Sequence, residues 1–273
     1  MDSRFGLILF STDPAFIGKA VVAGVDAIIV DWENVAKGKR QAIADTQINY
    51  DTLDDLKRVR ASTDSQVICR VNNCGPATER EVEEAIEGGA DEILLPMVQT
   101  IGEVEKVIDQ VKGRCGVGIL VETGPAVELA QELGSLPLSR AYVGLNDLAI
   151  DRGVPNIFMV LVDGTVECVR KAFRVPFGFG GLTLPDRGYP IPCRLLIGEL
   201  ARLRCNFSFL RRSFHQDIKG CNMAVEIPRI REALQEAFRR TPYEVTRDRR
   251  QLEEAVLAYH DGLTPATAVS IDG

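Results

Sequence analysis

The chain has 273 residues, of which 45% are hydrophobic and 26% charged, and its formal net charge is −7. These values suit one large soluble α/β domain with a sizeable core, and the lack of a basic stripe argues against nucleic acid as a partner. No apolar run approaches the roughly 20 residues of a membrane span, and no signal-peptide pattern follows Met1. We therefore expect no membrane partner and a cytoplasmic protein.

Short apolar runs alternate with amphipathic stretches along the chain. The runs are rich in Val, Ile and Leu, as is typical of parallel strands buried on both faces. The strand candidates are 5–10, 27–30, 67–71, 92–95, 117–121, 141–145, 175–179 and 206–210. The clearest helix candidates are 78–87, 102–111, 126–133, 160–173 and 193–203.

Eight β-α repeats over about 225 residues predict the α/β class and, within it, a (β/α)8 barrel, also called a TIM barrel. The alternative is an open doubly wound sheet. No G-x-G-x-x-G follows the first strand candidate, which weakens a dinucleotide-binding form of that alternative.

Residues 1–225 are the predicted barrel and catalytic domain, and 226–273 a C-terminal helical extension and tail. The helical part runs from about Pro228 to Tyr259, with an interruption at Thr241-Pro242. This region either completes the last α element or packs on a neighbouring subunit.

The seven cysteines are irregularly spaced and include no C-x-x-C pair. This pattern argues against a disulfide framework and against a zinc site. We expect reduced thiols, several of them buried as small hydrophobic residues.

Residues at the C-terminal ends of barrel strands face the active-site mouth. Acids, arginines, an amide and a glycine gather there. The candidates are Asp31, Glu33, Arg70, Asn72, Glu122, Asp147, Gly180 and Arg211.

Glu122 and Asp147 follow neighbouring parallel strands, so their charges repel unless a cation lies between them. Hard carboxylate oxygens suit Mg²⁺ or Mn²⁺ better than zinc. Arg70 could then bind a substrate carboxylate or carbonyl, and metal and arginine together would stabilise an enolate. Asn72, Gly180 and Arg211 are further candidates for substrate contacts.

Structural interpretations of the same residues stay open at this point. Either Glu122 or Asp147 could instead cap the helix that follows it. Asp31 and Glu33 could serve only to hold their loops, and Arg211 could be solvated or part of an interface.

Five stretches, taken in order, resemble the HpcH/HpaI aldolase and citrate lyase β-subunit family of the phosphoenolpyruvate/pyruvate barrel superfamily. The second strand candidate ends in a D-x-E pattern, and the fourth is apolar and ends in proline. The stretches are Val25 to Glu33, Arg70-Val71-Asn72, Glu92 to Pro96, Leu120 to Thr123, and Gly144 to Ala149.

The resemblance implies that Glu122 and Asp147 hold Mg²⁺ or Mn²⁺ and that Arg70 contacts the substrate carboxyl or enolate. It also implies a homo-oligomer, trimeric or hexameric, in which the last barrel helix exchanges between subunits. Reactions of this family cleave or form a carbon–carbon bond beside a carbonyl, on a 2-oxo acid or an acyl thioester.

The chain departs from the aldolase branch at two positions. Asn34 stands where that branch carries an acid/base histidine, and an amide takes no proton near neutral pH. Leu120 stands where the aldolases tend to have Gln. Both departures favour the citrate lyase-like branch, and the general base stays open between Glu33, Asp31 and a metal-bound water.

The leading hypothesis is therefore a metal-dependent carbon–carbon lyase or aldolase. The alternatives are a hydrolase or isomerase of the same superfamily and a non-catalytic protein that binds metal and oxo acid. The sequence leaves open whether coenzyme A or an acyl carrier protein takes part.

Overall fold

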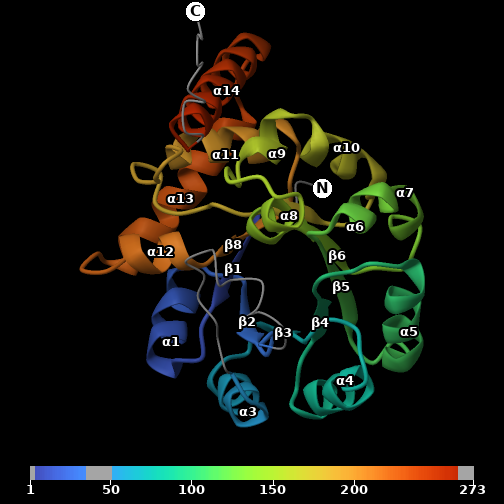
Figure 1. Ribbon diagram of the computed structural model, residues 1–273. Coiled ribbons are helices and arrows are strands. Elements are labelled where there is room, and N and C mark those ends of the chain that lie inside the picture. The colour runs from blue at the N-terminus through green and yellow to red at the C-terminus, as the bar shows by residue number, and fades with distance from the viewer. Residues whose placement is uncertain (1–3, 35–50, 264–273) are drawn as a thin grey trace, which may run out of the picture.

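The computed structural model describes residues 4–34 and 51–263. One parallel 8-stranded sheet curls into a barrel, with helices around it (Figure 1). Its hydrogen-bonded order is β7-β6-β5-β4-β3-β2-β1-β8. The strands are β1 Gly6–Phe10, β2 Ala27–Asp31, β3 Gln66–Arg70, β4 Glu92–Leu95, β5 Gly116–Val121, β6 Arg140–Val143, β7 Phe177–Phe179 and β8 Phe207–Leu210. The predicted (β/α)8 barrel is confirmed.

The barrel is nearly closed between β7 and β8. The Asn206 N–H donates to the Phe177 carbonyl at 2.8 Å, and the Ser208 hydroxyl donates to the Phe179 carbonyl at 2.7 Å. A Cβ at position 178 would lie 2.1 Å from the Phe207 carbonyl oxygen. Only glycine at position 178 therefore lets the two strands approach this closely.

Two of the predicted helices are interrupted. Segment 126–133 forms two short helices that meet at Leu129, and segment 160–173 breaks where Gly164 takes a φ of 90°. The helices are α1 Pro14–Ala23, α3 Leu53–Ser62, α4 Thr78–Glu87, α5 Ile101–Val111, α6 Gly124–Glu128, α7 Ala130–Leu133, α8 Leu145–Asp151, α9 Met159–Val162, α10 Thr165–Ala172, α11 Cys193–Arg202, α12 Arg212–Asp217, α13 Met223–Phe238 and α14 Pro242–Leu263. No helix in the described part of the chain is long and apolar enough to cross a membrane.

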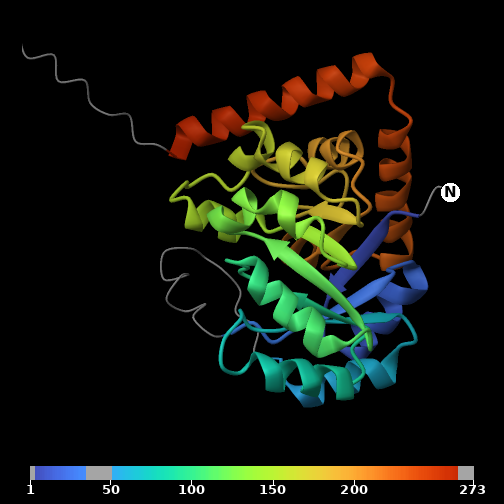
Figure 2. The same ribbon diagram turned by 90° about the vertical axis from the view of Figure 1, so that its right-hand side faces the viewer.

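The C-terminal region contributes both to the barrel and to a structure beyond it. Helix α13 packs on α1 and α11 and so takes the place of the eighth barrel helix. The predicted boundary at residue 225 thus lies inside α13, and the extension proper is α14. Helix α14 packs on α9 and α11 and runs toward the face where the strands end (Figure 2). The exchange of a helix between subunits stays a prediction.

Alternate residues of all the strands except β7 point into the barrel and form a buried cluster of their own. That cluster is Ile8, Phe10, Ala27, Ile29, Ile68, Leu94, Leu120, Tyr142, Phe207 and Phe209. The next inward positions, one step nearer the mouth, are mostly polar or glycine. They are Asp31, Arg70, Glu122, Gly144 and Arg211. The candidate site therefore lies on top of a packed apolar interior.

A buried ion pair closes the other end of the barrel. Arg140 Nε lies 2.6 Å from Glu92 Oε1, and Arg140 Nη2 donates to Gln66 Oε1 at 2.9 Å. A Cβ at position 118 would lie 2.7 Å from the same Glu92 oxygen, so Gly118 leaves room for the pair. Glu92 is only 1% exposed, and its charge depends on Arg140.

We expect Arg140→Met to lower the free energy of unfolding by about 3–5 kcal/mol, because it leaves the Glu92 charge buried without its partner. Urea unfolding followed by circular dichroism measures this loss. The matched control is Arg114→Met, because Arg114 forms the same kind of pair with Glu83 at about 40% exposure of both side chains. That variant should change stability little. Equal losses in the two variants would contradict the structural role of the buried pair.

Candidate active site

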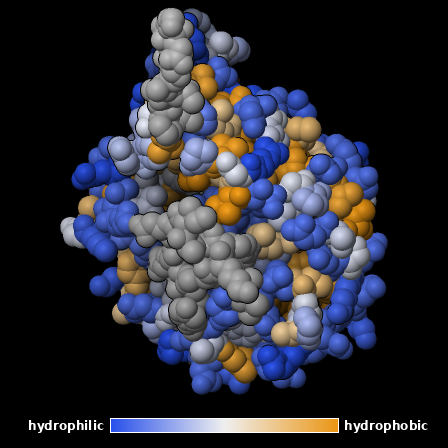
Figure 3. All heavy atoms as spheres, in the orientation of Figure 1, coloured by the Kyte–Doolittle hydropathy of each residue, from blue (hydrophilic) through white to orange (hydrophobic). Residues whose placement is uncertain are grey.

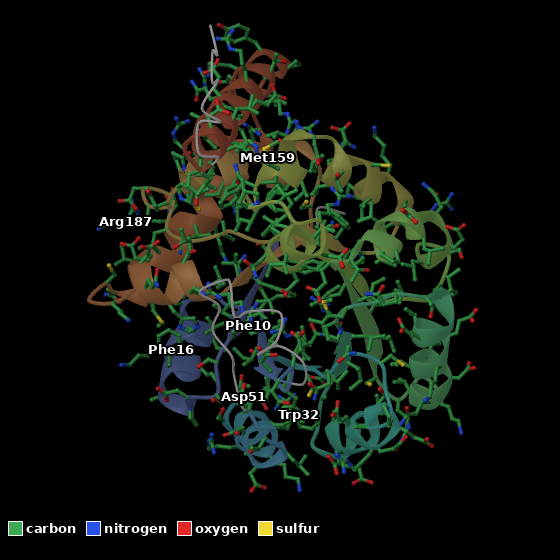
Figure 4. The ribbon with its side chains drawn as sticks, viewed as in Figure 1. Phe10, Phe16, Trp32, Asp51, Met159 and Arg187 are labelled. Carbon is green, nitrogen blue, oxygen red and sulfur yellow. The ribbon has the colours of Figure 1, made fainter. Side chains whose placement is uncertain are left out.

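A cavity of about 280 Å³ opens at the mouth of the barrel. The charged side chains that line it are Arg70, Glu122, Asp147, Arg211 and Arg212. Phe10, labelled at the centre of the mouth in Figure 4, lines its floor. The cavity thus brings together five of the predicted site residues: Arg70, Glu122, Asp147, Gly180 and Arg211. Asp31, Glu33 and Asn72 do not line it.

Glu122 follows β5 and is held from two sides. Its Oε1 accepts the Met97 N–H at 2.9 Å, from a backbone with the left-handed φ of 54°. A Cβ at position 144 would lie 2.3 Å from its Oε2, so Gly144 lets Glu122 lie against the end of β6. Glu122 is 1% exposed. The carboxylate is therefore fixed in place and largely shielded from solvent.

Asp147 differs from the sequence interpretation in its secondary structure. Strand β6 ends at Val143, and α8 begins at Leu145 with Gly144 as its N-cap. Asp147 therefore lies in the first turn of a helix and does not cap it. It is 7% exposed, and its Oδ1 has no hydrogen-bond partner in the described part of the protein.

The two buried carboxylates line the same cavity and repel each other electrostatically. The pKa of Glu122 is raised to about 8, chiefly by burial and then by the charges of Asp147 and Glu33, while Arg70 opposes the rise. Two buried carboxylates that repel each other favour a cation between them. The unpartnered Asp147 oxygen and the hard oxygen donors fit Mg²⁺ or Mn²⁺. No cluster of three or more His, Cys, Asp or Glu that could hold a metal occurs in residues 4–34 and 51–263. If an ion binds at the mouth, the oxygen donors are those of Glu122 and Asp147, the carboxylates that line the cavity.

Arg70 is held by acids of the neighbouring strand. The parallel register places Asp31 opposite Arg70. Arg70 Nε and Nη2 donate to the two oxygens of Asp31 at 2.7 and 2.5 Å, and Nη1 lies 2.9 Å from Glu33 Oε2. Burial lowers the pKa of Arg70, but Asp31 and Glu33 outweigh burial and raise it overall. Both acids thus position Arg70 from beneath the cavity.

Arg211 has weaker ionic contacts than Arg70. Its closest ionic contact is Asp31 at 3.4 Å, and its guanidinium lies 4.7 Å from the centre of the Phe10 ring. Burial, followed by the nearby Arg70, lowers the pKa of Arg211. The side chain is 31% exposed, so its N–H groups can reach a bound anion.

Asn72 lies outside the cavity and links neighbouring segments of the mouth by hydrogen bonds. Its Oδ1 accepts the Asn34 N–H at 2.9 Å, and its Nδ2 donates to Glu81 Oε1 at 3.0 Å. A substrate contact of Asn72 stays a prediction. Gly180 does line the cavity, and a Cβ there would lie 3.0 Å from the Tyr142 hydroxyl oxygen.

Sequence reasoning missed two residues of this region. Asp51 accepts the Asp31 N–H at 2.9 Å, and burial raises its pKa (Figure 4). Tyr259 of α14 lines the cavity. No local pattern marks either residue, because each reaches the site through tertiary packing of a segment distant in sequence.

Two buried carboxylates and a buried arginine lie at the mouth of this parallel barrel, the end at which barrel enzymes carry their active sites. Residues 4–156, more than half of the chain, match the HpcH/HpaI aldolase/citrate lyase family model. The chain belongs to this family, as its sequence motifs predicted.

A solved structure similar to this one is that of the citrate synthase SbnG, with a TM-score of 0.59 and 16% sequence identity. The similarity covers 80% of this chain and 91% of that chain. Identity this low supports the fold alone. No curated protein matches the sequence.

Proposed function

We propose that the protein is a Mg²⁺-dependent carbon–carbon lyase or aldolase that acts through an enolate of a 2-oxo acid or an acyl thioester. The observation that carries this proposal is the carboxylate pair. Among the residues that the structure describes, Asp147 Oδ1 is buried without a hydrogen-bond partner, and the pKa of Glu122 is raised by burial and by Asp147. Both features suit residues that bind a divalent cation.

The roles of the other residues follow from their contacts. Glu122 and Asp147 would hold the ion, which when bound would supply Lewis-acid stabilisation of negative charge on a substrate oxygen. Arg70, fixed by Asp31 and Glu33, places a second positive charge at the same mouth. Arg211 can bind the substrate carboxylate.

The general base is left unassigned. No histidine lines the cavity in the described part of the chain. Asp31 and Glu33 remain candidates, although both are engaged with Arg70. A pH–rate profile that is unchanged in Glu33→Gln would eliminate Glu33.

Calorimetric titration with Mg²⁺ and then with oxalate, which mimics the enolate of pyruvate, tests the site. We expect oxalate to bind only after Mg²⁺. Product analysis with candidate oxo acids then tests the reaction, because a lyase gives two carbon fragments and an isomerase gives one. Oxalate binding that does not depend on Mg²⁺ would contradict the proposal.

Family membership also supports a homo-oligomer, and we propose a trimer or hexamer. Light scattering coupled to size-exclusion chromatography measures the mass directly. A monomer at micromolar concentration would contradict this part of the proposal.

A further inference from the structure

Helix α14 is fastened to the side of the barrel by buried or half-buried polar contacts. Near its start, Arg240 Nη2 donates to the Gly198 carbonyl at 2.5 Å, and a Cβ at position 198 would lie 2.8 Å from Arg240 Nη1. Midway, Arg249 Nη1 donates to the Leu161 carbonyl at 2.7 Å and to Glu199 Oε1 at 2.9 Å. These contacts fix the direction of α14 toward the mouth.

A buried amide completes the attachment at the cavity. Asn156 is fully buried, its Nδ2 donates to the Val256 carbonyl at 2.9 Å, and its Oδ1 accepts the Phe158 N–H at 3.0 Å. Tyr259 follows Val256 by three residues, roughly one helical turn. Asn156 therefore joins the loop before α9 to the part of α14 that carries Tyr259, and both Phe158 and Tyr259 line the cavity.

The remaining wall of the cavity is apolar. It is formed by the loop before α9, the segment between β7 and α11, and α14. Its side chains are Pro155, Ile157, Phe158, Leu182, Tyr189, Pro190 and Tyr259. All of them except Pro155 lie after residue 156, where the family match ends. Hydrophobic residues also show on the mouth face below α14 in Figure 3. The charged lining residues come from other segments: β3, the end of β5, α8 and the start of α12.

The cavity lining thus has a charged part and an apolar part, and each part suits a different end of a ligand. The charged part of the cavity suits a 2-oxo acid head, and the apolar wall suits the group attached to it. Ile157, Phe158 and Leu182 themselves offer a second carboxylate no polar side-chain group, so burial against them would remove its hydration without compensation. The arginines of the described lining belong to the charged part of the cavity. With about 280 Å³, the cavity lies near the lower end of the roughly 300–1,000 Å³ typical of ligand sites, so the group must be small.

We propose that the site selects a 2-oxo acid substrate with an apolar group of about phenyl size, and that Tyr259 of α14 packs against this group as a specificity-determining residue. The proposal rests on the proposed function, because it places the oxo acid head at the carboxylate pair.

The test compares three probes on the Mg²⁺-loaded protein by calorimetry: oxalate, phenylpyruvate and 2-oxoglutarate. We expect phenylpyruvate to bind at least tenfold more tightly than 2-oxoglutarate. If oxalate fails to bind, the proposed function itself is wrong. If oxalate binds but 2-oxoglutarate equals or exceeds phenylpyruvate, only the assignment of an apolar substrate is overturned.

Tyr259 is tested in the same assay. Tyr259→Ala should weaken phenylpyruvate about tenfold and leave oxalate unchanged, whereas Tyr259→Phe should keep the preference because the ring remains. The matched control is Tyr243→Ala, on the same helix, exposed and away from the cavity. Equal weakening of oxalate and phenylpyruvate by Tyr259→Ala would overturn the specificity role and show a structural one.

Discussion

Glu122→Gln should abolish Mg²⁺ binding and reduce kcat/KM at least about 1,000-fold, the scale expected when a main electrostatic contribution to the transition state is lost. The amide has nearly the same shape and can still accept the Met97 N–H, but it carries no charge for a cation. Asp147→Asn should behave in the same way. Calorimetry with Mg²⁺ and steady-state kinetics measure the two effects separately.

Stability distinguishes loss of the metal site from misfolding. Burial and the charge of Asp147 disfavour the ionised form of Glu122, so Glu122→Gln should leave the metal-free protein at least as stable as the wild type. The matched control is Glu132→Gln on the exposed side of α7, which should change neither metal binding nor turnover. Full metal-dependent activity in Glu122→Gln or Asp147→Asn would show that the assignment of the pair is wrong.

The sequence predicted the barrel because the strands are predominantly apolar runs, with few polar residues or glycines among them. Burial on both faces of a parallel sheet requires such runs, so they are readable without tertiary information. The residue at which β6 ends was harder to predict from the sequence. Tyr142 and Val143 continue the apolar pattern into Leu145, yet α8 already begins at Leu145. Asp147 therefore reaches the mouth from a helical turn, and its place beside Glu122 depends on Gly144.

The roles of the mouth acids depend on pairing that no single strand reveals. Asp31 and Glu33 are candidates for acid/base chemistry because they lie at the end of a strand or just after it, and this role stays a prediction. The register of β2 and β3 also places Asp31 opposite Arg70, and both acids contact that arginine. Tyr259 could not be predicted at all, since its position follows from the fastening of α14 by Asn156 and other polar groups.

Arg70 offers the sharpest test of this pairing. Arg70→Met should lower the free energy of unfolding by about 3–5 kcal/mol, because the buried Asp31 and Glu33 then lose the cation that contacts both of them. Arg211, 3.4 Å from Asp31, stays in place. Turnover should be lost as well. Arg70→Lys keeps the charge but not the planar fork, so we expect a smaller loss of stability and a kcat/KM at least 100-fold below that of the wild type, about 2.7 kcal/mol. Urea unfolding and steady-state kinetics measure the two losses.

A second substitution separates the structural contribution of Arg70 from its catalytic one. Asp31→Asn in the Arg70→Met background removes one of the two buried acidic charges that Arg70 contacted, so the double variant should be more stable than Arg70→Met alone. Activity should stay lost, because no cation then replaces the guanidinium at the carboxylate pair. Recovery of both stability and turnover would mean that Arg70 acts only as a structural partner of Asp31. Recovery of stability alone is the result expected if the acids hold Arg70 in place for the substrate.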